Sequence, residues 1–142
     1  MREGDVLTHC FRPFPAAPVI SDGRIIIEIL EARERGVIFD IGHGVEYFGF
    51  ETAETILNSG FLPDAISSDV HSLRIKGPAY DQLVTLSTFL NLWMSITDII
   101  AASTTGPARA ICRPELGTPS PASIGHATIL RIKKGEFIFT DS

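Results

Sequence analysis

The chain has 142 residues and a formal net charge of −5, which is the size of a single domain with a mild acidic excess. Its 12 Lys and Arg residues are spread along the sequence, which argues against a nucleic-acid surface, and no apolar run approaches the roughly 20 residues of a membrane span. The two cysteines are too few for a disulfide scaffold, so we predict a cytoplasmic protein that binds neither nucleic acid nor a membrane.

Three short apolar segments are typical of buried strands. They run from Val6 to Thr8, from Val37 to Ile41 and from Ala65 to Ser68. A helical pattern from Arg24 to Arg35 separates the first two, and another from Glu51 to Ser59 separates the second and third. This alternation predicts an α/β fold with parallel strands and helices packed outside them.

Further helices are expected after the third strand. The pattern predicts them from Asp81 to about Met94, from Thr97 to Ser103, and from Ala108 to Cys112 behind Pro107. Trp93, on the first of them, is expected in the core. Cys10 follows the first strand, and we interpret it as a small buried apolar residue.

The composition changes after Pro114, where Gly and Pro punctuate an irregular stretch. Two strands are predicted beyond it, from Ala127 to Ile132 and from Glu136 to Thr140. We therefore divide the chain into a first part, residues 1–113, and the start of a small β domain, residues 114–142.

Three strand-helix units cannot close a (β/α)₈ barrel, which needs about 250 residues. The chain is then either a small open α/β sheet or the last part of a barrel. Both of its ends fall beside apolar segments, where natural domains usually have polar termini, so we expect a piece of a longer fold.

Polar residues follow each of the three predicted strands: His9, His43 and Asp69. The carboxyl ends of parallel strands lie on one face, so these residues should converge. Imidazole and carboxylate suit a divalent metal such as Zn²⁺, and an aspartate there can also accept a proton from water. The competing interpretation is structural, with each His hydrogen-bonded in place and Asp69 capping a turn.

The segments around these residues resemble the amidohydrolase superfamily, in its dihydroorotase- and hydantoinase-like deacetylase branch. Gly4-Asp5-Val6-Leu7-Thr8-His9 is similar to the family's barrel strand six, and Phe39-Asp40-Ile41-Gly42-His43-Gly44 to strand seven. Ser67-Ser68-Asp69-Val70-His71 is similar to its strand-eight Ser-Thr-Asp-Leu-His pattern. The resemblance continues in order through Thr104-Thr105-Gly106-Pro107 to the small β domain, so it covers essentially the whole chain.

The resemblance implies a partial TIM barrel, about the last three βα units, with one or two divalent metals, Zn²⁺ in the first place. It implies that His9 and Asp69 bind metal and that Asp69 is the catalytic base. His43, with Gly42 and Gly44, would face the substrate, as would His71, for which a structural role is an equal alternative. The implied reaction is metal-assisted cleavage of an amide, such as an N-acyl or cyclic amide, or of a related ester in a small-molecule substrate.

The resemblance also implies ligands on strands one, four and five of the barrel: a His-x-His pair, a carboxylated Lys and a further His. The segments for these strands have no counterpart here, and the sequence contains no His-x-His pair. Two ligands hold a divalent ion weakly, so we expect little or no activity from this chain alone. An alternative is a non-catalytic remnant that self-associates, because an open half-barrel exposes strand edges, and we expect a homo-oligomer. A further alternative is an independent α/β binding module without metal.

Overall fold

The computed structural model describes residues 1–44, 46–72, 76, 80–124 and 126–139. Strands β1 (Val6–Leu7) and β2 (Ile38–Phe39) pair in parallel, with Val6 opposite Ile38. A third segment joins β2 through a parallel bridge between Asp40 and Ala65. The parallel arrangement predicted from the sequence is thus present, although its regular strands are shorter than predicted.

Backbone hydrogen bonds continue past the bridge and hold the third segment beside β2. The amide of Ile41 donates to the carbonyl of Ala65 at 3.0 Å, and the amide of His43 donates to that of Ser67 at 2.9 Å. The ladder is not regular, because Gly42 and Gly44 have positive φ values of 51° and 40°. These turns bring polar residues to the carboxyl end of the sheet.

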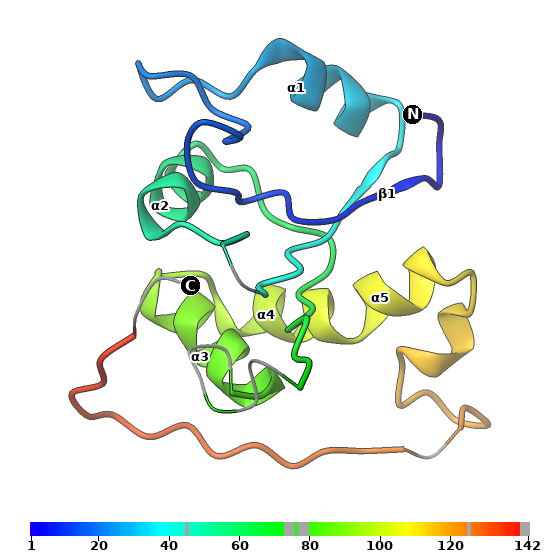
Figure 1. Ribbon diagram of the computed structural model, residues 1–142. Coiled ribbons are helices and arrows are strands. Elements are labelled where there is room, and N and C mark those ends of the chain that lie inside the picture. Colours follow the sequence, from blue (N-terminus) through cyan, green and yellow to red (C-terminus); the bar gives the residue numbers. More distant parts are fainter. Residues whose placement is uncertain (45, 73–75, 77–79, 125, 140–142) are drawn as a thin grey trace.

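The helices lie where the sequence pattern predicts them, with boundaries shifted by a few residues (Figure 1). They are α1 (Ile27–Glu34), α2 (Phe50–Asn58), α3 (Gln82–Asn91), α4 (Ile96–Ser103) and α5 (Thr105–Ala110), followed by a 3₁₀ turn, η1 (Pro114–Leu116). Local capping explains two of the starts. The Asp81 carboxylate accepts from the Val84 amide before α3, and the Ser95 hydroxyl accepts from the Asp98 amide before α4.

Aromatic side chains from distant segments form the centre of the core. Phe48 and Phe89 are fully or almost fully buried, with ring centroids 5.6 Å apart, and Phe11 lies 6.1 Å from Phe89. Phe39 of β2 packs edge-on against Phe61 at 5.1 Å. Cys10 joins this cluster and is buried, as the sequence predicted, whereas Trp93 is 94% exposed. The core prediction for Trp93 was wrong, because this residue follows the end of α3 in a left-handed conformation (φ 65°).

The segment after η1 differs from its prediction. Within residues 126–139 the structure contains no strand, and Figure 1 shows this part of the chain running past the helices in an extended path. Ile129 and Ile138 are 97% and 94% exposed. The two predicted strands are therefore wrong over the described residues, for the physical reason that a hairpin with no apolar face to cover is only marginally stable.

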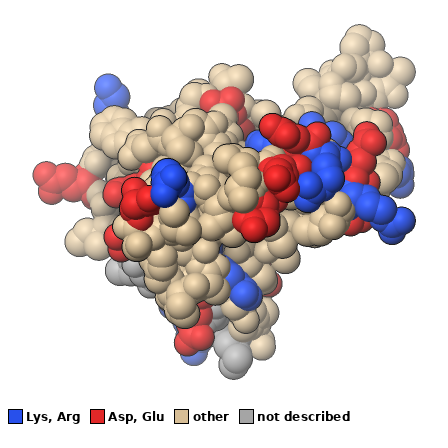
Figure 2. Space-filling model, turned by 90° about the horizontal axis from the view of Figure 1, so that it is seen from above, with Lys and Arg blue, Asp and Glu red and all other residues tan. Residues whose placement is uncertain are grey.

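Charged side chains of both signs are interspersed on the face seen in Figure 2, with no broad area of one sign. Several form exposed pairs, such as Arg24 with Asp22 at 2.6 Å and Arg35 with Glu31 at 3.8 Å. Among the helices in the described part of the chain, none has the length and apolar character that a membrane span requires.

Candidate functional site

The candidate site lies at the carboxyl ends of the three parallel segments. His9 follows β1, the loop of residues 42–44 follows β2, and Asp69 follows the third segment. The amide of Gly44 donates to the carbonyl of Ser68 at 3.1 Å, which brings the loop beside Asp69. The carboxyl ends of the three segments therefore lie together, as strand order predicted.

His9 contacts the loop through its ring. Its Nδ1 lies 2.7 Å from the carbonyl oxygen of Gly42. Since a carbonyl oxygen can only accept, Nδ1 carries a proton, so in the neutral imidazole Nε2 is the ring nitrogen with a lone pair. The other side of the ring is covered by Tyr47, which stacks on it with centroids 4.1 Å apart. This arrangement fixes the ring of a half-buried histidine.

Asp69 lies on the other side of the same loop. A methyl group built on Gly44 would collide with the Oδ2 atom of Asp69, so the carboxylate packs directly on the glycine backbone. The Asp69 side chain is otherwise exposed at the rim of the sheet. Gly42 and Gly44 thus hold His9 and Asp69 against one short loop, which agrees with the close backbone approach expected of these glycines.

Both predicted metal ligands have left-handed backbone conformations. The φ angle is 58° at His9 and 48° at Asp69, values that residues other than glycine seldom adopt. Such conformations cost about 1 to 3 kcal/mol each and persist only where the surrounding structure imposes them. His9 and Asp69 thus have strained backbones at the ends of the two segments that flank β2.

The structure turns the side chain of His43 away from this pair. The His43 side chain is 3% exposed and stacks on Phe48, with ring centroids 4.4 Å apart. Its ring therefore faces the core in this structure, although its backbone lies in the site loop. His71 is exposed and lies two residues beyond Asp69.

Several residues around the site were not singled out from the sequence. Thr8, Asp40 and Ser67 form hydrogen bonds behind the loop. Arg12 places its guanidinium 4.5 Å from the centre of the Tyr47 ring. The available signal was the polar character of Asp40 and Ser67 within otherwise apolar segments, which could have marked them as inward-facing.

The donors present fit part of a divalent metal site. A histidine nitrogen and a carboxylate are suitable ligands for Zn²⁺, and Nε2 of His9 has the lone pair that coordination needs. No group of three or more metal-binding side chains occurs among the described residues. This stretch of sequence thus offers His9 and Asp69, fewer than the three protein ligands of a typical catalytic zinc site.

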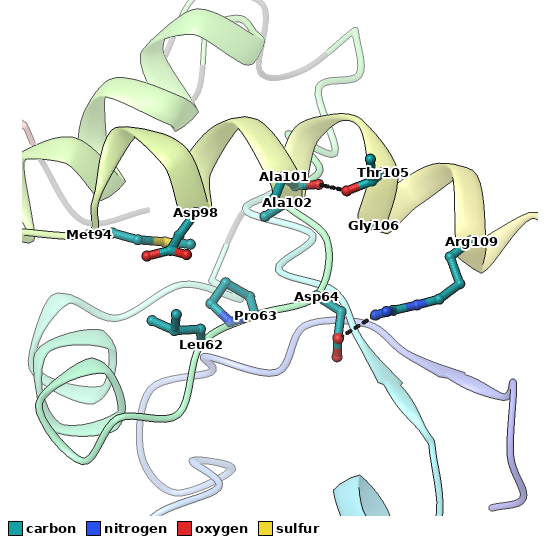
Figure 3. Close-up of a pocket in the computed structure, with 10 residues that line it drawn as sticks. All are labelled: Leu62, Pro63, Asp64, Met94, Asp98, Ala101, Ala102, Thr105, Gly106 and Arg109. Carbon is teal, nitrogen blue, oxygen red and sulfur yellow. Dashed lines mark hydrogen bonds and ion pairs between the residues drawn. The ribbon is translucent and has the colours of Figure 1, made fainter. Parts of the chain in front are cut away.

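Two cavities flank the sheet. One, of about 220 Å³, lies beside His9 and is lined by Arg12, Ala17, Pro18 and Ile29 among others. The other, of about 160 Å³, lies at the beginning of the third segment, where Figure 3 shows Asp64 pointing to Arg109. The second cavity is at the opposite end of that segment from Asp69, so we assign Asp64 and Arg109 to the scaffold.

Electrostatics distinguish a buried cysteine near the site. Burial raises the pKa of the Cys10 thiol, and the nearby Asp40 carboxylate acts in the same direction. The side chain is 5% exposed within the core cluster. Cys10 is therefore a protonated packing residue, not a metal ligand or nucleophile.

Comparison with known proteins gives consistent similarities, although no family model matches the chain. The chain is 34% identical over 144 residues to a deacetylase of Enterococcus faecalis, with 100% of this chain and 39% of that protein covered. It is 32% identical over 142 residues to a deacetylase of Brucella anthropi, with 98% of this chain and 35% of that protein covered. The chain thus spans between 35% and 39% of the length of these curated relatives.

Two solved structures resemble the fold. An adenine deaminase superposes with a TM-score of 0.81 and 34% identity, over 87% of this chain and 34% of the deaminase. A dihydroorotase superposes with a TM-score of 0.70 and 32% identity, over 79% of this chain and 30% of that protein.

Proposed function

Because the chain belongs to the amidohydrolase superfamily, we propose that it forms part of a metal-dependent hydrolase that cleaves amide or related ester bonds. The observation that carries the proposal is the placement of His9 and Asp69 against Gly42 and Gly44 of one loop. The relatives named deacetylase support an N-acyl substrate for the complete protein, and the dihydroorotase neighbour supports a cyclic amide. Both are small molecules with a C–N bond to a carbonyl carbon.

His9 and Asp69 are the residues that would hold the metal. A divalent ion, Zn²⁺ in the first place, supplies polarisation of the scissile carbonyl and lowers the pKa of water. His9 would bind through Nε2, since its Nδ1 donates to the Gly42 carbonyl. Tyr47 covers one face of the His9 ring and limits the access of water on that side.

Asp69 is proposed as the base of the reaction. Its carboxylate would accept the proton of the attacking water and then transfer it to the nitrogen or oxygen of the leaving group. The close contact with Gly44 supports this role, because it fixes the carboxylate beside the backbone that would line the substrate. His71, two residues further on, and the loop of residues 42–44 are the proposed substrate contacts.

The chain's place in the complete protein follows from the same proposal. The segments ending at His9, His43 and Asp69 would be the last three strands of a (β/α)₈ barrel, with residues 1–113 in the barrel and residues 114–142 beginning a β domain. Apolar side chains left exposed in this chain, such as Ile27 at 60% and Val6 at 44%, would be covered by the rest of the barrel or, in the chain on its own, by further copies, so we also propose that the chain alone forms a homo-oligomer.

A chimera provides the test of function, since two ligands are expected to give little activity alone. The chain would replace the matched segment of the Enterococcus faecalis deacetylase, and hydrolysis of N-acetyl and cyclic amides would be followed with Zn²⁺. We expect the chimera to hydrolyse at least one of these amides. Asp69→Asn should lower the rate of hydrolysis by at least about a hundredfold, since general-base catalysis contributes about 10²- to 10⁴-fold. Asp22→Asn, a change in an exposed ion pair, is the matched control and should retain the rate. A folded, metal-loaded chimera with equal rates for Asp69→Asn and the parent would contradict the proposal.

A further inference from the structure

A hydrogen-bonded network lies behind the candidate site and connects all three parallel segments. The Oδ2 atom of Asp40 accepts from the hydroxyl of Thr8 and from that of Ser67, both at 2.7 Å. Thr8 precedes His9 at the end of β1, and Ser67 lies in the third segment before Asp69. Asp40 therefore links the two segments that carry the predicted metal ligands.

Ser67 fixes the loop that follows β2 at two consecutive peptide groups. Its hydroxyl oxygen accepts from the amide of Gly42 at 3.1 Å, and its carbonyl accepts from the amide of His43 at 2.9 Å. A serine hydroxyl has one hydrogen, which here is donated to Asp40. The carboxylate thereby turns the lone pairs of Ser67 toward the Gly42 amide.

The loop in turn determines which ring nitrogen of His9 carries the proton. With the peptide group between Gly42 and His43 held by Ser67, the Gly42 carbonyl is directed at Nδ1 of His9, 2.7 Å away. Thr8 and His9 also close on Gly42 from the other side. A Cβ atom at Gly42 would lie 2.5 Å from the Thr8 hydroxyl and 2.6 Å from Nδ1 of His9. Asp40 thus reaches the imidazole through the Ser67 hydroxyl, the Gly42 amide, the backbone of Gly42 itself and the hydrogen bond that Nδ1 of His9 donates to the Gly42 carbonyl.

We propose that Asp40 is a positioning residue that, through Ser67 and the Gly42 carbonyl, keeps His9 in the tautomer protonated at Nδ1 and so presents Nε2 to the metal. The metal-binding part of this inference rests on the proposed function. Groups that orient a ligating histidine in this way fix its tautomer and ring orientation. Here the orienting carboxylate acts at a distance, by fixing the backbone carbonyl that accepts from the ring.

A second observation distinguishes the positioning of His9 from a role in which Asp40 only joins the parallel segments. The Oδ1 atom of Asp40 is buried and has no hydrogen-bond partner among the described residues. A buried carboxylate oxygen without a partner is costly, and a neutral side chain would join the segments at lower cost. Joining the segments does not by itself require the charged group that Asp40 supplies.

The test measures the His9 tautomer directly by ¹⁵N NMR of the full chain, with ¹⁵N label at histidine. The spectra are recorded without metal and at a pH where the imidazole is neutral. The His9 signals are assigned by their loss in His9→Gln. We expect the Nδ1–H tautomer to predominate in the wild type and to lose that preference in Asp40→Ala and Ser67→Ala. Ser67→Thr, which retains the hydroxyl, should restore it. Ser87→Ala, which removes an exposed helix hydroxyl, and Asp22→Ala are the matched controls.

A merely structural role would lower the melting temperature of the variants and leave the tautomer unchanged. Folded Asp40→Ala and Ser67→Ala chains with the wild-type tautomer would overturn the proposal, and Ser67→Ala decides the matter if Asp40→Ala does not fold. Zinc titration gives a second readout, with binding weakened about 10- to 100-fold in the two alanine variants. If the wild type binds no zinc, the proposed function fails while the tautomer result still tests the role of Asp40.

Discussion

His9 and Asp69 both adopt left-handed backbone conformations at the ends of parallel segments. The loop of residues 42–44 lies between them, with Gly42 packed against His9 and Gly44 packed against Asp69. The absence of side chains at the two glycines allows the polar groups to approach the backbone, and the network of Asp40 and Ser67 holds that backbone in place. The placement of His9 therefore depends on the space left at Gly42 as much as on the His9 side chain itself.

Replacing Gly42 by alanine should destabilise the chain more than the same change at Gly4. Both residues have positive φ values, 51° and 80°, so both substitutions introduce backbone strain of about 1 kcal/mol. Only at Gly42 does the new methyl group collide with Thr8 and His9, whereas nothing lies within 4 Å of it at Gly4. We expect an additional loss of about 1 to 3 kcal/mol in urea unfolding. Equal losses at the two sites would contradict the packing described for Gly42.

The two cysteines should differ in reactivity toward iodoacetamide. The Cys10 side chain is buried and its pKa is raised, so the reactive thiolate is scarce even in alkaline solution, whereas Cys112 is exposed. Mass spectrometry of the native chain at pH 8 should find Cys112 alkylated and Cys10 intact. Urea should make Cys10 reactive, and rapid native labelling of Cys10 would show that the core around it is open.

Strand order alone was enough to predict that His9 and Asp69 would converge, because the carboxyl ends of parallel strands share one face. Their positive φ values were not predictable, since tertiary contacts impose them against local preference. The burial of His43 depends on its stacking with Phe48, which follows from the path of the loop and has no signature in the sequence. The exposure of Trp93 has a similar cause, a left-handed turn at the end of α3.

At the scale of elements, Asp64 joins the third segment to β2, α1 and α5. Its carboxylate accepts from the Phe39 amide at 2.9 Å and pairs with Arg109 at 2.6 Å and with Arg33 at 3.4 Å. Arg33 also lies over the Phe61 ring, with its guanidinium carbon 3.7 Å from the centroid. Burial lowers the pKa of Arg33, although Asp64 opposes this effect. The contacts place Asp64 in the scaffold at the end of the sheet away from Asp69.

Asp64→Ala should therefore reduce stability without altering the site residues. The change leaves the buried Phe39 amide without its acceptor and leaves the half-buried Arg33 without a carboxylate partner, with only its hydrogen bond to the Leu62 carbonyl, which together cost about 2 to 4 kcal/mol. Thermal unfolding followed by circular dichroism measures the loss. Asp22→Ala, in an exposed pair with Arg24, should stay within about 0.5 kcal/mol of the wild type. A similar small effect for Asp64→Ala would contradict its role as a scaffold residue.

Helix positions were predicted to within a few residues, and the structure shows local caps at two of the starts, Asp81 before α3 and Ser95 before α4. Strand lengths were less predictable, because the ladder is interrupted by the site loop itself. The prediction of two strands near the C-terminus was wrong for a different reason. Alternating apolar residues indicate a possible strand, but a strand forms only where another strand and a core are present, and the described chain supplies neither there.

At the scale of the whole molecule, the core joins the three parallel segments with α2, α3 and α4, and residues 126–139 lie outside it. Limited trypsin digestion should therefore cleave at Arg131, Lys133 and Lys134 before Arg33 and Arg109, which lie in α1 and α5. Mass spectrometry of the early products should detect a large fragment that retains both helices. First cleavage within α1 or α5 would contradict the division between a packed body and an exposed C-terminal segment.

We propose that His9 and Asp69 form part of one divalent metal site. Calorimetric titration of Zn²⁺ into the wild type, His9→Ala and Asp69→Ala tests it most directly, with His126→Ala and Asp22→Ala as controls that remove exposed residues of the same types. We predict weak binding to the wild type and to both controls, and a loss of more than about tenfold in affinity in each ligand variant. Indistinguishable titrations for all five proteins would contradict the claim.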